Sequence, residues 1–295
     1  MISRIGLFLL ANFGILGVLS ISSRVLGVDR WLASQGMAGQ INGLLIMALV
    51  IGFGGSFISL AISKWMAKRS MGVRIIETPS NKSEQWLVDT VTAQAKQAGI
   101  GMPEVGIFDS PQPNAFATGM NRNAALVAVS TGLLTAMSTD EVEAVLGHEV
   151  SHVANGDMIT MGLLQGLLNT FVIFFARIIG MLIDRAIFKI ERGIGPGYWI
   201  GSIVAEMVLG VVAAIIASWF SRRREFRADI GGAELAGRQK MIDALKCLQG
   251  GQQVDDLPGQ LAAFGIFGGK SSGLKKLLMS HPPLEQRIAA LENQR

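Results

Sequence analysis

Charged residues are scarce in this sequence: they make up 16% of its 295 residues, whereas soluble globular proteins average about 25%. Cysteine is nearly absent as well. The one thiol, Cys247, excludes an intrachain disulfide and agrees with a cytoplasmic location. Only three histidines and one tyrosine, Tyr198, are present, so few side chains are available for acid–base or metal chemistry. The shortage of charge points to a membrane protein.

Four long stretches with few charges account for this composition. They are Ile5–Ser22, Ile41–Ser63, Met158–Ile183 and Tyr198–Phe220. Each is near the roughly 20 residues that a helix needs to cross a bilayer. The third and fourth each carry one charge, Arg177 and Glu206. These two could pair across the helices, or this hairpin could sit shallowly in the membrane.

The pattern divides the chain into two hydrophobic hairpins, 1–64 and 158–220, and two polar segments, 65–157 and 221–295. A cleaved signal peptide is disfavoured, since a second span closely follows the first without a clear cleavage site. Basic residues cluster after the second and fourth stretches. The positive-inside rule then predicts that both termini and residues 64–157 are cytoplasmic. These basic residues are interpreted as interfacial anchors, not as a nucleic-acid site.

The polar segments predict a mostly helical domain with a small sheet. Ser138 and Glu141 fit a capping box that begins a helix ending at Asn155-Gly156. Other expected helices are 84–98, 131–137, 222–235, 239–248 and 283–292; expected strands are 104–108, 115–118 and 124–129; and 250–273 is expected to be a glycine-rich loop. The predicted fold class is therefore an α+β membrane protein with about four transmembrane helices.

The most informative motif is His148-Glu149-Val150-Ser151-His152. Residues four apart lie on one face of a helix, so both imidazoles can reach one zinc ion. Glu149 lies off that pair and can address a water molecule on the metal. With three histidines in the chain, a chance match is rare. The alternative, an amphipathic helix with two incidental histidines, is disfavoured.

A catalytic zinc ion needs a third protein ligand, and Glu225 is the best candidate. Taken alone, a glutamate after three arginines could equally be an interfacial salt-bridge residue. Asp229, four residues later on the same helical face, favours the ligand interpretation. A ligating histidine usually donates its other N–H to a carboxylate, and Asp229 could accept that bond from His148.

At this point the sequence resembles a known family. The H-E-x-x-H motif followed by E-x-x-x-D on a second helix is the gluzincin pattern. Nearly the whole chain resembles the bacterial heat-shock membrane proteases of peptidase family M48. The matching segments are residues 114–119, 147–152, 155–157, 221–229 and 281–283, with Arg287. The resemblance implies one zinc ion per subunit bound by His148, His152 and Glu225, catalysis by Glu149, and Asp157 as a further supporting carboxylate.

The expected mechanism uses zinc-activated water, with Glu149 as general base. His281 and Arg287 are the candidates for a second donor to the oxyanion, although His281 could merely precede a helix. The segment Asn114-Ala115-Phe116-Ala117 is expected either to pair with the extended substrate backbone or to be a plain hairpin strand.

The resemblance implies an endopeptidase of the bacterial inner membrane that cleaves damaged or misfolded membrane proteins. Expected partners are the bilayer, membrane-protein or unfolded polypeptide substrates, and other membrane proteases. One alternative is processing of prenylated C-termini, as in the related Ste24-type proteases, for which four spans are too few to enclose a chamber. A non-catalytic scaffold is the other, and the intact Glu149 argues against it.

Overall fold

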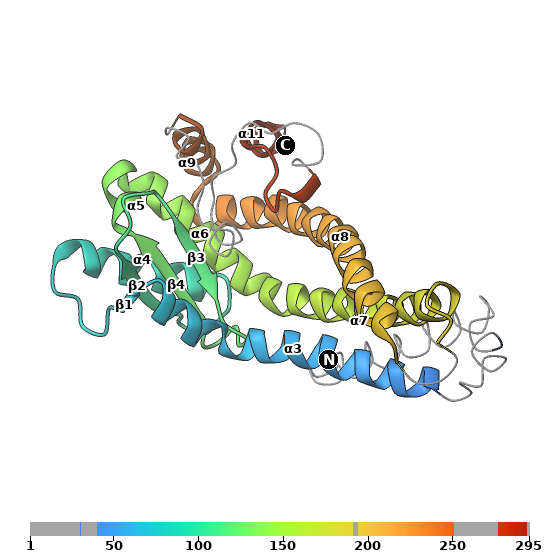
Figure 1. Ribbon diagram of the computed structural model, residues 1–295. Helices are drawn as coiled ribbons and strands as arrows, with labels where there is room; N and C mark the ends of the chain where they lie inside the picture. Colours follow the sequence, from blue (N-terminus) through green and yellow to red (C-terminus); the bar gives the residue numbers. More distant parts are fainter. Residues whose placement is uncertain (1–29, 31–39, 191–193, 251–276, 294–295) are drawn as a thin grey trace. The chain divides into compact units, whose positions relative to one another are not determined.

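The computed structural model describes residues 30, 40–190, 194–250 and 277–293 (Figure 1). The chain divides into two compact units. The helical unit comprises residues up to Ile58 together with Gly162–Ile215. The mixed unit comprises Ser59–Met161 and Ile216–Arg295. Three long helices contribute residues to both units: α3 (Gln40–Ser70), α7 (Asp157–Ala186) and α8 (Pro196–Ala236).

These three helices are long and apolar enough to cross a membrane. They correspond to the second, third and fourth hydrophobic stretches, while the first stretch, Ile5–Ser22, lies outside the described residues. Within the helical unit, large apolar side chains such as Val50, Phe57 and Met207 are exposed. Soluble proteins rarely expose apolar surface of this extent, so these helices have the surface of a membrane protein.

The helical unit packs through small residues and aromatic rings. Leu45, Phe53, Phe174 and Tyr198 belong to its core. A Cβ at Gly52 would lie 2.4 Å from the Thr170 hydroxyl oxygen, so α3 and α7 meet nearly backbone to backbone. The predicted ion pair is confirmed, with Arg177 Nη2 3.1 Å from Glu206 Oε1.

The mixed unit contains a four-stranded sheet in the order β1-β2-β4-β3. Its strands are β1 (Arg74–Ile75), β2 (Glu104–Phe108), β3 (Ala115–Thr118) and β4 (Leu126–Ser130). Strands β2 and β4 are parallel, and the outer pairings are antiparallel. The register Ala115↔Val129 and Thr118↔Leu126 confirms the expected hairpin. It also places β3 at an edge of the sheet that the described strands form.

Three helices pack against this sheet: α4 (Lys82–Gln97), α5 (Thr131–Ala136) and α6 (Thr139–Asn155). Helix α9 (Arg238–Gly250) packs against α6, α11 (Leu284–Glu292) packs against α9, and the end of α8 adds apolar side chains to the same core. Leu87, Val127, Leu146 and Leu245 are fully buried among them. The mostly helical fold with a small mixed sheet confirms the predicted fold class.

Helix α6 begins and ends where the sequence predicts. Ser138 accepts a hydrogen bond from the Glu141 N–H, and the Glu141 carboxylate accepts one from the Ser138 N–H, which is the reciprocal capping box. Gly156 ends the helix in the left-handed region at φ +72°. Helix α7 begins at the next residue, Asp157, so a single glycine separates the two helices.

Candidate metal centre

Helix α6 presents two buried imidazoles on one face. His148 and His152 are one helical turn apart, and their Nε2 atoms are 3.1 Å from each other. The rings meet edge to face, with centroids 4.6 Å apart. Two ring nitrogens so close, and aimed at the same point, form half of a metal site.

Helix α8 brings a carboxylate to the same point. Glu225 Oε2 is 3.6 Å from His148 Nε2, and Oε1 is 3.4 Å from His152 Nε2. In a tetrahedral site with bonds of about 2.0–2.1 Å, ligand atoms are separated by about 3.3–3.4 Å. The three observed separations bracket this value. His148, His152 and Glu225 therefore fit one small divalent cation without rearrangement.

Each histidine has a carboxylate behind it. His148 Nδ1 lies 3.0 Å from Asp229 Oδ1, and His152 Nδ1 lies 2.7 Å from Asp157 Oδ2. Such contacts fix the ring orientation and direct the opposite nitrogen, Nε2, toward a metal. The structure thus places both predicted supporting carboxylates, Asp157 and Asp229, at the histidines. Asp157 is completely buried.

The electrostatics of the site favour a cation. Burial alone would lower the pKa of His152, but hydrogen bonds to Asp157 and Glu225 outweigh it and raise the pKa to about 10. Burial likewise opposes a charge on His148, yet Asp229 and Glu225 raise its pKa. Carboxylates that hold protons on two buried imidazoles would stabilise a divalent cation in place of those protons.

The C-terminal segment adds a histidine and an arginine. His281 Nδ1 is 2.7 Å from Glu225 Oε2, so only its other ring nitrogen could face a substrate. Arg287 makes a two-pronged contact with Asp229, at 2.8 and 2.5 Å, and its side chain is 1% exposed. The expected role of Arg287 as an oxyanion donor stays a prediction. In this structure the guanidinium holds the Asp229 carboxylate that contacts His148.

The other predicted site residues lie on α6 and β3. Glu149 is buried on α6, directly after the first ligand. Strand β3, with the expected substrate segment Ala115-Phe116-Ala117, packs against α6. Ala115 and Phe116 are buried, so a substrate could meet this strand only through its backbone edge. Asn114 precedes the strand, and its buried Oδ1 has no hydrogen-bond partner among the described residues.

Sequence reasoning missed the arginines that contact Asp157. Arg227 Nη2 is 3.3 Å from Asp157 Oδ1, and Arg224 Nη1 is 3.5 Å from the Asp157 carbonyl oxygen. The signal was present, since the two arginines are three residues apart and lie on either side of Glu225 in helical spacing. Arg224 belongs to the basic cluster after the fourth hydrophobic stretch that was interpreted as a membrane anchor, whereas Arg227 was given no role.

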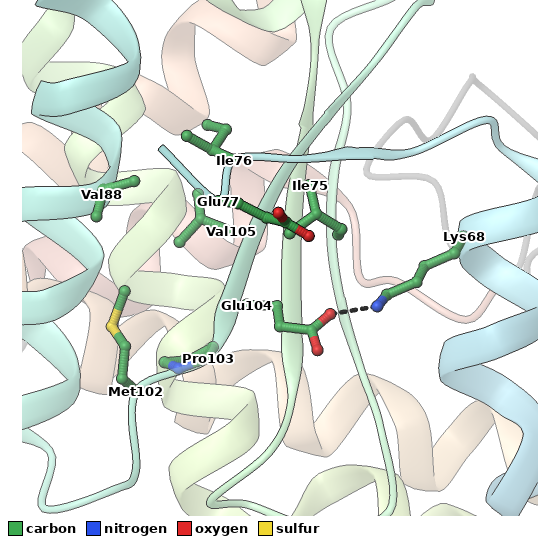
Figure 2. A pocket seen from close by; sticks show the side chains of 9 residues that line it. All are labelled: Lys68, Ile75, Ile76, Glu77, Val88, Met102, Pro103, Glu104 and Val105. Carbon is green, nitrogen blue, oxygen red and sulfur yellow. Dashed lines mark ion pairs between the residues drawn. The ribbon is translucent and has the colours of Figure 1, made fainter. Parts of the chain in front are cut away.

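A groove of about 470 Å³ lies at the opposite edge of the sheet (Figure 2). Apolar residues from β1, β2 and α4, among them Ile75, Val88 and Val105, line it with Glu104. Figure 2 shows Glu104 paired with Lys68, and Lys64 also contacts it at 2.9 Å. None of the lining residues belongs to the metal centre, so the volume of this groove says nothing about the chemistry.

The chain is similar to known proteases over most of its length. The model of peptidase family M48 matches residues 81–295. "Protease HtpX" of Thioalkalivibrio sulfidiphilus is 64% identical, covering 98% of both chains. "Protease HtpX homolog" of Nitrosomonas europaea is 60% identical, covering 99% of this chain and all of the relative.

One solved structure shares the fold. The crystal structure of Ste24p from S. mikatae aligns with a TM-score of 0.61 over 95% of this chain and 66% of that one. The sequences are 18% identical, so this likeness speaks for the architecture alone.

Proposed function

The chain belongs to peptidase family M48 and is a membrane metalloprotease, and we propose that it is a zinc-dependent endopeptidase that holds one zinc ion per chain. One observation carries the proposal. The nearest nitrogens of His148 and His152 and the carboxylate oxygens of Glu225 are separated by 3.1–3.6 Å, as ligands of a tetrahedral cation are. Two histidines and one glutamate are a donor set of catalytic zinc sites, which keep a further position for solvent.

Zinc would supply Lewis-acid chemistry, lowering the pKa of water toward 7 and stabilising negative charge on a carbonyl oxygen. The chain's own residues do the rest. Glu149 takes a proton from the attacking water as general base and then passes it to the leaving amine. Asp229 and Asp157 keep the two imidazoles oriented, and Arg287 keeps Asp229 in place.

His281 is proposed to serve both the metal centre and the substrate. Its Nδ1 contacts the Glu225 carboxylate at 2.7 Å, which steadies the third ligand. Its side chain keeps a fifth of its surface exposed, unlike that of Arg287, so Nε2 can donate to a developing oxyanion. We assign the second donor to His281 for this reason.

The free edge of β3 is proposed to bind the substrate as an added strand. Backbone pairing reads side chains poorly, so it suits an enzyme that accepts many sequences. Damaged or misfolded membrane proteins are the proposed substrates, since they offer extended segments near the bilayer. Other membrane proteases are proposed as partners in the degradation of these membrane proteins.

The proposed location is the bacterial inner membrane, with several spans and with both termini and the metal centre in the cytoplasm. The basic residues after the second and fourth hydrophobic stretches support this orientation. Among them, the Arg223 guanidinium lies over the ring of Trp219, 4.3 Å from its centroid. Tryptophan and arginine are typical of the boundary between lipid and water.

Processing of prenylated C-termini, the alternative considered from the sequence, is not favoured. The relatives that match nearly the whole chain are named Protease HtpX, not Ste24. The similarity to Ste24p extends to the fold only. A non-catalytic scaffold is not favoured either, because family membership and an intact Glu149 indicate an enzyme.

The decisive experiment measures zinc in the purified full-length protein by mass spectrometry, in wild type and in Glu225→Ala. The wild type should contain about one zinc ion per chain, and the variant should lose most of it. Glu234→Ala, which removes an exposed glutamate from the same helix, is the matched control and should retain zinc. A zinc-free wild type, or equal zinc in Glu225→Ala, would refute the proposed site. Cleavage of unmodified casein then distinguishes a general endopeptidase from a prenyl-protein protease.

A further inference from the structure

Helices α6 and α8 touch nearly backbone to backbone beside the metal centre. A Cβ atom built on Gly232 would lie 3.0 Å from the His148 nitrogen and 3.1 Å from its Cα. A Cβ atom on Gly231 would lie 2.1 Å from Ser151 Oγ and 2.9 Å from Ser151 Cβ. Neither glycine has a side chain, so neither can bind the metal or transfer a proton.

The contact is reciprocal and lies at the ligands themselves. A Cβ atom on Gly147, the residue before the first ligand, would be 3.2 Å from the Gly232 carbonyl oxygen. On α8, Glu225, Asp229 and Gly232 are spaced by four and three residues and so share one helical face. The face of α8 that carries the third ligand is therefore the face whose glycine rests on the backbone of the first ligand.

We propose that Gly231 and Gly232 are positioning residues of the metal centre, which set the separation of α6 and α8 that lets Glu225 reach the ion held by His148 and His152. The inference rests on the proposed zinc site. It adds that the geometry of this site depends on two residues without side chains.

The distances around Gly232 show that a larger residue would push α8 away from α6. Ordinary van der Waals contact of a Cβ atom begins at 3.4 Å, so alanine at 232, with its nearest atom at 3.0 Å, requires about 0.4 Å of separation. The two nearest obstructing atoms, the His148 nitrogen and Cα, are backbone and cannot rotate away, whereas the third, Met241 Sδ at 3.2 Å, lies on a flexible side chain. Metal–ligand bonds tolerate only about 0.2 Å. A carboxylate carried on α8 would be moved beyond that tolerance, and we expect metal affinity to fall by about 10- to 100-fold.

The two glycines differ in a way that makes the inference testable. Gly232 faces backbone, whereas Gly231 faces a side chain. In Gly231→Ala, a second change of Ser151→Gly removes both obstructing atoms and leaves the Ser151 Cα, at 4.0 Å, as the nearest atom. Ser151→Gly should therefore restore metal binding to Gly231→Ala and should not restore it to Gly232→Ala.

The test uses full-length protein in detergent, with zinc affinity measured by competition against a chelator and ligand geometry by the visible absorption of the cobalt(II)-loaded protein. Gly210→Ala is the matched control, because Gly210 lies on the same helix and a Cβ atom there would meet nothing within 4 Å. Thermal unfolding of the metal-free variants checks the fold. Alanine is a better helix former than glycine, so weaker metal binding cannot be ascribed to a weaker helix.

The expected result is weaker zinc binding and an altered cobalt spectrum in Gly231→Ala and Gly232→Ala, wild-type behaviour in Gly210→Ala, and rescue by Ser151→Gly of the first variant alone. Wild-type affinity in both glycine variants, or no rescue, would overturn the inference while leaving the zinc site intact. If Gly232→Ala fails to fold, the rescue of Gly231→Ala decides by itself. A wild type that binds no zinc would instead refute the proposed function.

Discussion

The helical unit and the mixed unit bury polar groups in opposite ways. In the described part of the helical unit, polar side chains meet in isolated pairs, such as Arg177 with Glu206 and the Ser56 hydroxyl that donates to the Gly162 carbonyl oxygen. In the mixed unit, buried carboxylates crowd around two imidazoles and one guanidinium. Since burying unpaired charge is costly, the concentration of carboxylates in one place marks the functional site.

The difference also shows in what each unit does with glycine. Gly52 and Thr170 bring two apolar helices together in the helical unit. Helices in lipid gain no hydrophobic free energy by associating, so they depend on close packing. In the mixed unit, Gly232 brings a ligand-bearing helix against the ligand-bearing backbone of another. The same device therefore serves packing in one unit and metal geometry in the other. Four experiments would test how far this separation of roles holds.

The largest effect is expected at Glu149. Glu149→Gln keeps the shape of the side chain but removes the general base, so casein cleavage should fall by roughly 10²- to 10⁴-fold. Zinc content, measured on the same preparation, should stay at the wild-type level because Glu149 is not a ligand. Residual cleavage near the wild-type rate would contradict the mechanism.

A smaller effect is expected at Asp157. Asp157→Asn removes the charge behind His152 while keeping the hydrogen-bonding shape, and zinc affinity should fall by about 10- to 100-fold. A chelator competition assay measures this. Asp243→Asn, which neutralises an exposed carboxylate on α9, is the control and should leave affinity unchanged. If both variants bound zinc equally well, the carboxylate behind His152 would be merely structural.

Metal binding should weaken as the pH falls. A ligating histidine must be neutral, yet in the metal-free protein the pKa of His152 is raised to about 10, so zinc must displace a proton below that pH. Apparent affinity for zinc should decline by up to about tenfold per pH unit for each displaced proton.

The stability of the metal-free fold should show the opposite dependence on pH. A raised pKa contributes stability that is full below about 6.5 and is lost as pH rises toward 10. Titrating zinc content and thermal unfolding from about pH 5 to about pH 9 tests both signs, and constant zinc content would contradict the site.

The smallest effect on the metal centre is expected from the helical unit. Arg177→Met leaves Glu206 without its partner, which should lower the free energy of unfolding by about 2 kcal/mol. Adding Glu206→Leu should recover part of that loss, because no charge remains unpaired. Zinc content should not change in either variant. Thermal unfolding in detergent, with metal analysis alongside, would show whether the units are energetically separate.

The sequence predicted α6 and the approach of His148 to His152 because these signals are local. The capping box, Gly156 and the spacing of His148 and His152 each lie within one helix. The ion pair between Arg177 and Glu206 was also predictable, since a charge in an apolar helix needs a partner. Strands β2 and β3 have the predicted bounds.

Other features depended on contacts that no local pattern contains. Strand β1 has two residues, too few to show alternation, and was not predicted. Strand β4 begins at Leu126 instead of the expected Ala124, because its pairing with β2 and β3 begins at Glu104↔Leu126 and Thr118↔Leu126. The fourth hydrophobic stretch and the following polar helix form one continuous α8, since no helix breaker separates them.

Most of the expected glycine-rich loop, 250–273, lies outside the described residues. The contact of α8 with α6 was invisible in the sequence for a different reason. A glycine pair can be interpreted as a helix contact only when the opposing helix is known. Ser151 and Gly231 are 80 positions apart, so no local pattern links them.

The joint at Gly156 has a practical consequence for anyone seeking a soluble fragment. The residue just after it, Asp157, opens an apolar helix and also braces His152, while Glu225 and Asp229 sit on the far end of another such helix. A fragment that lacks these two apolar helices would therefore lose Glu225, and it would also lose Asp157 and Asp229, the carboxylates that contact the two histidines. Enzymology on this protein has to be done with its lipid-facing parts attached.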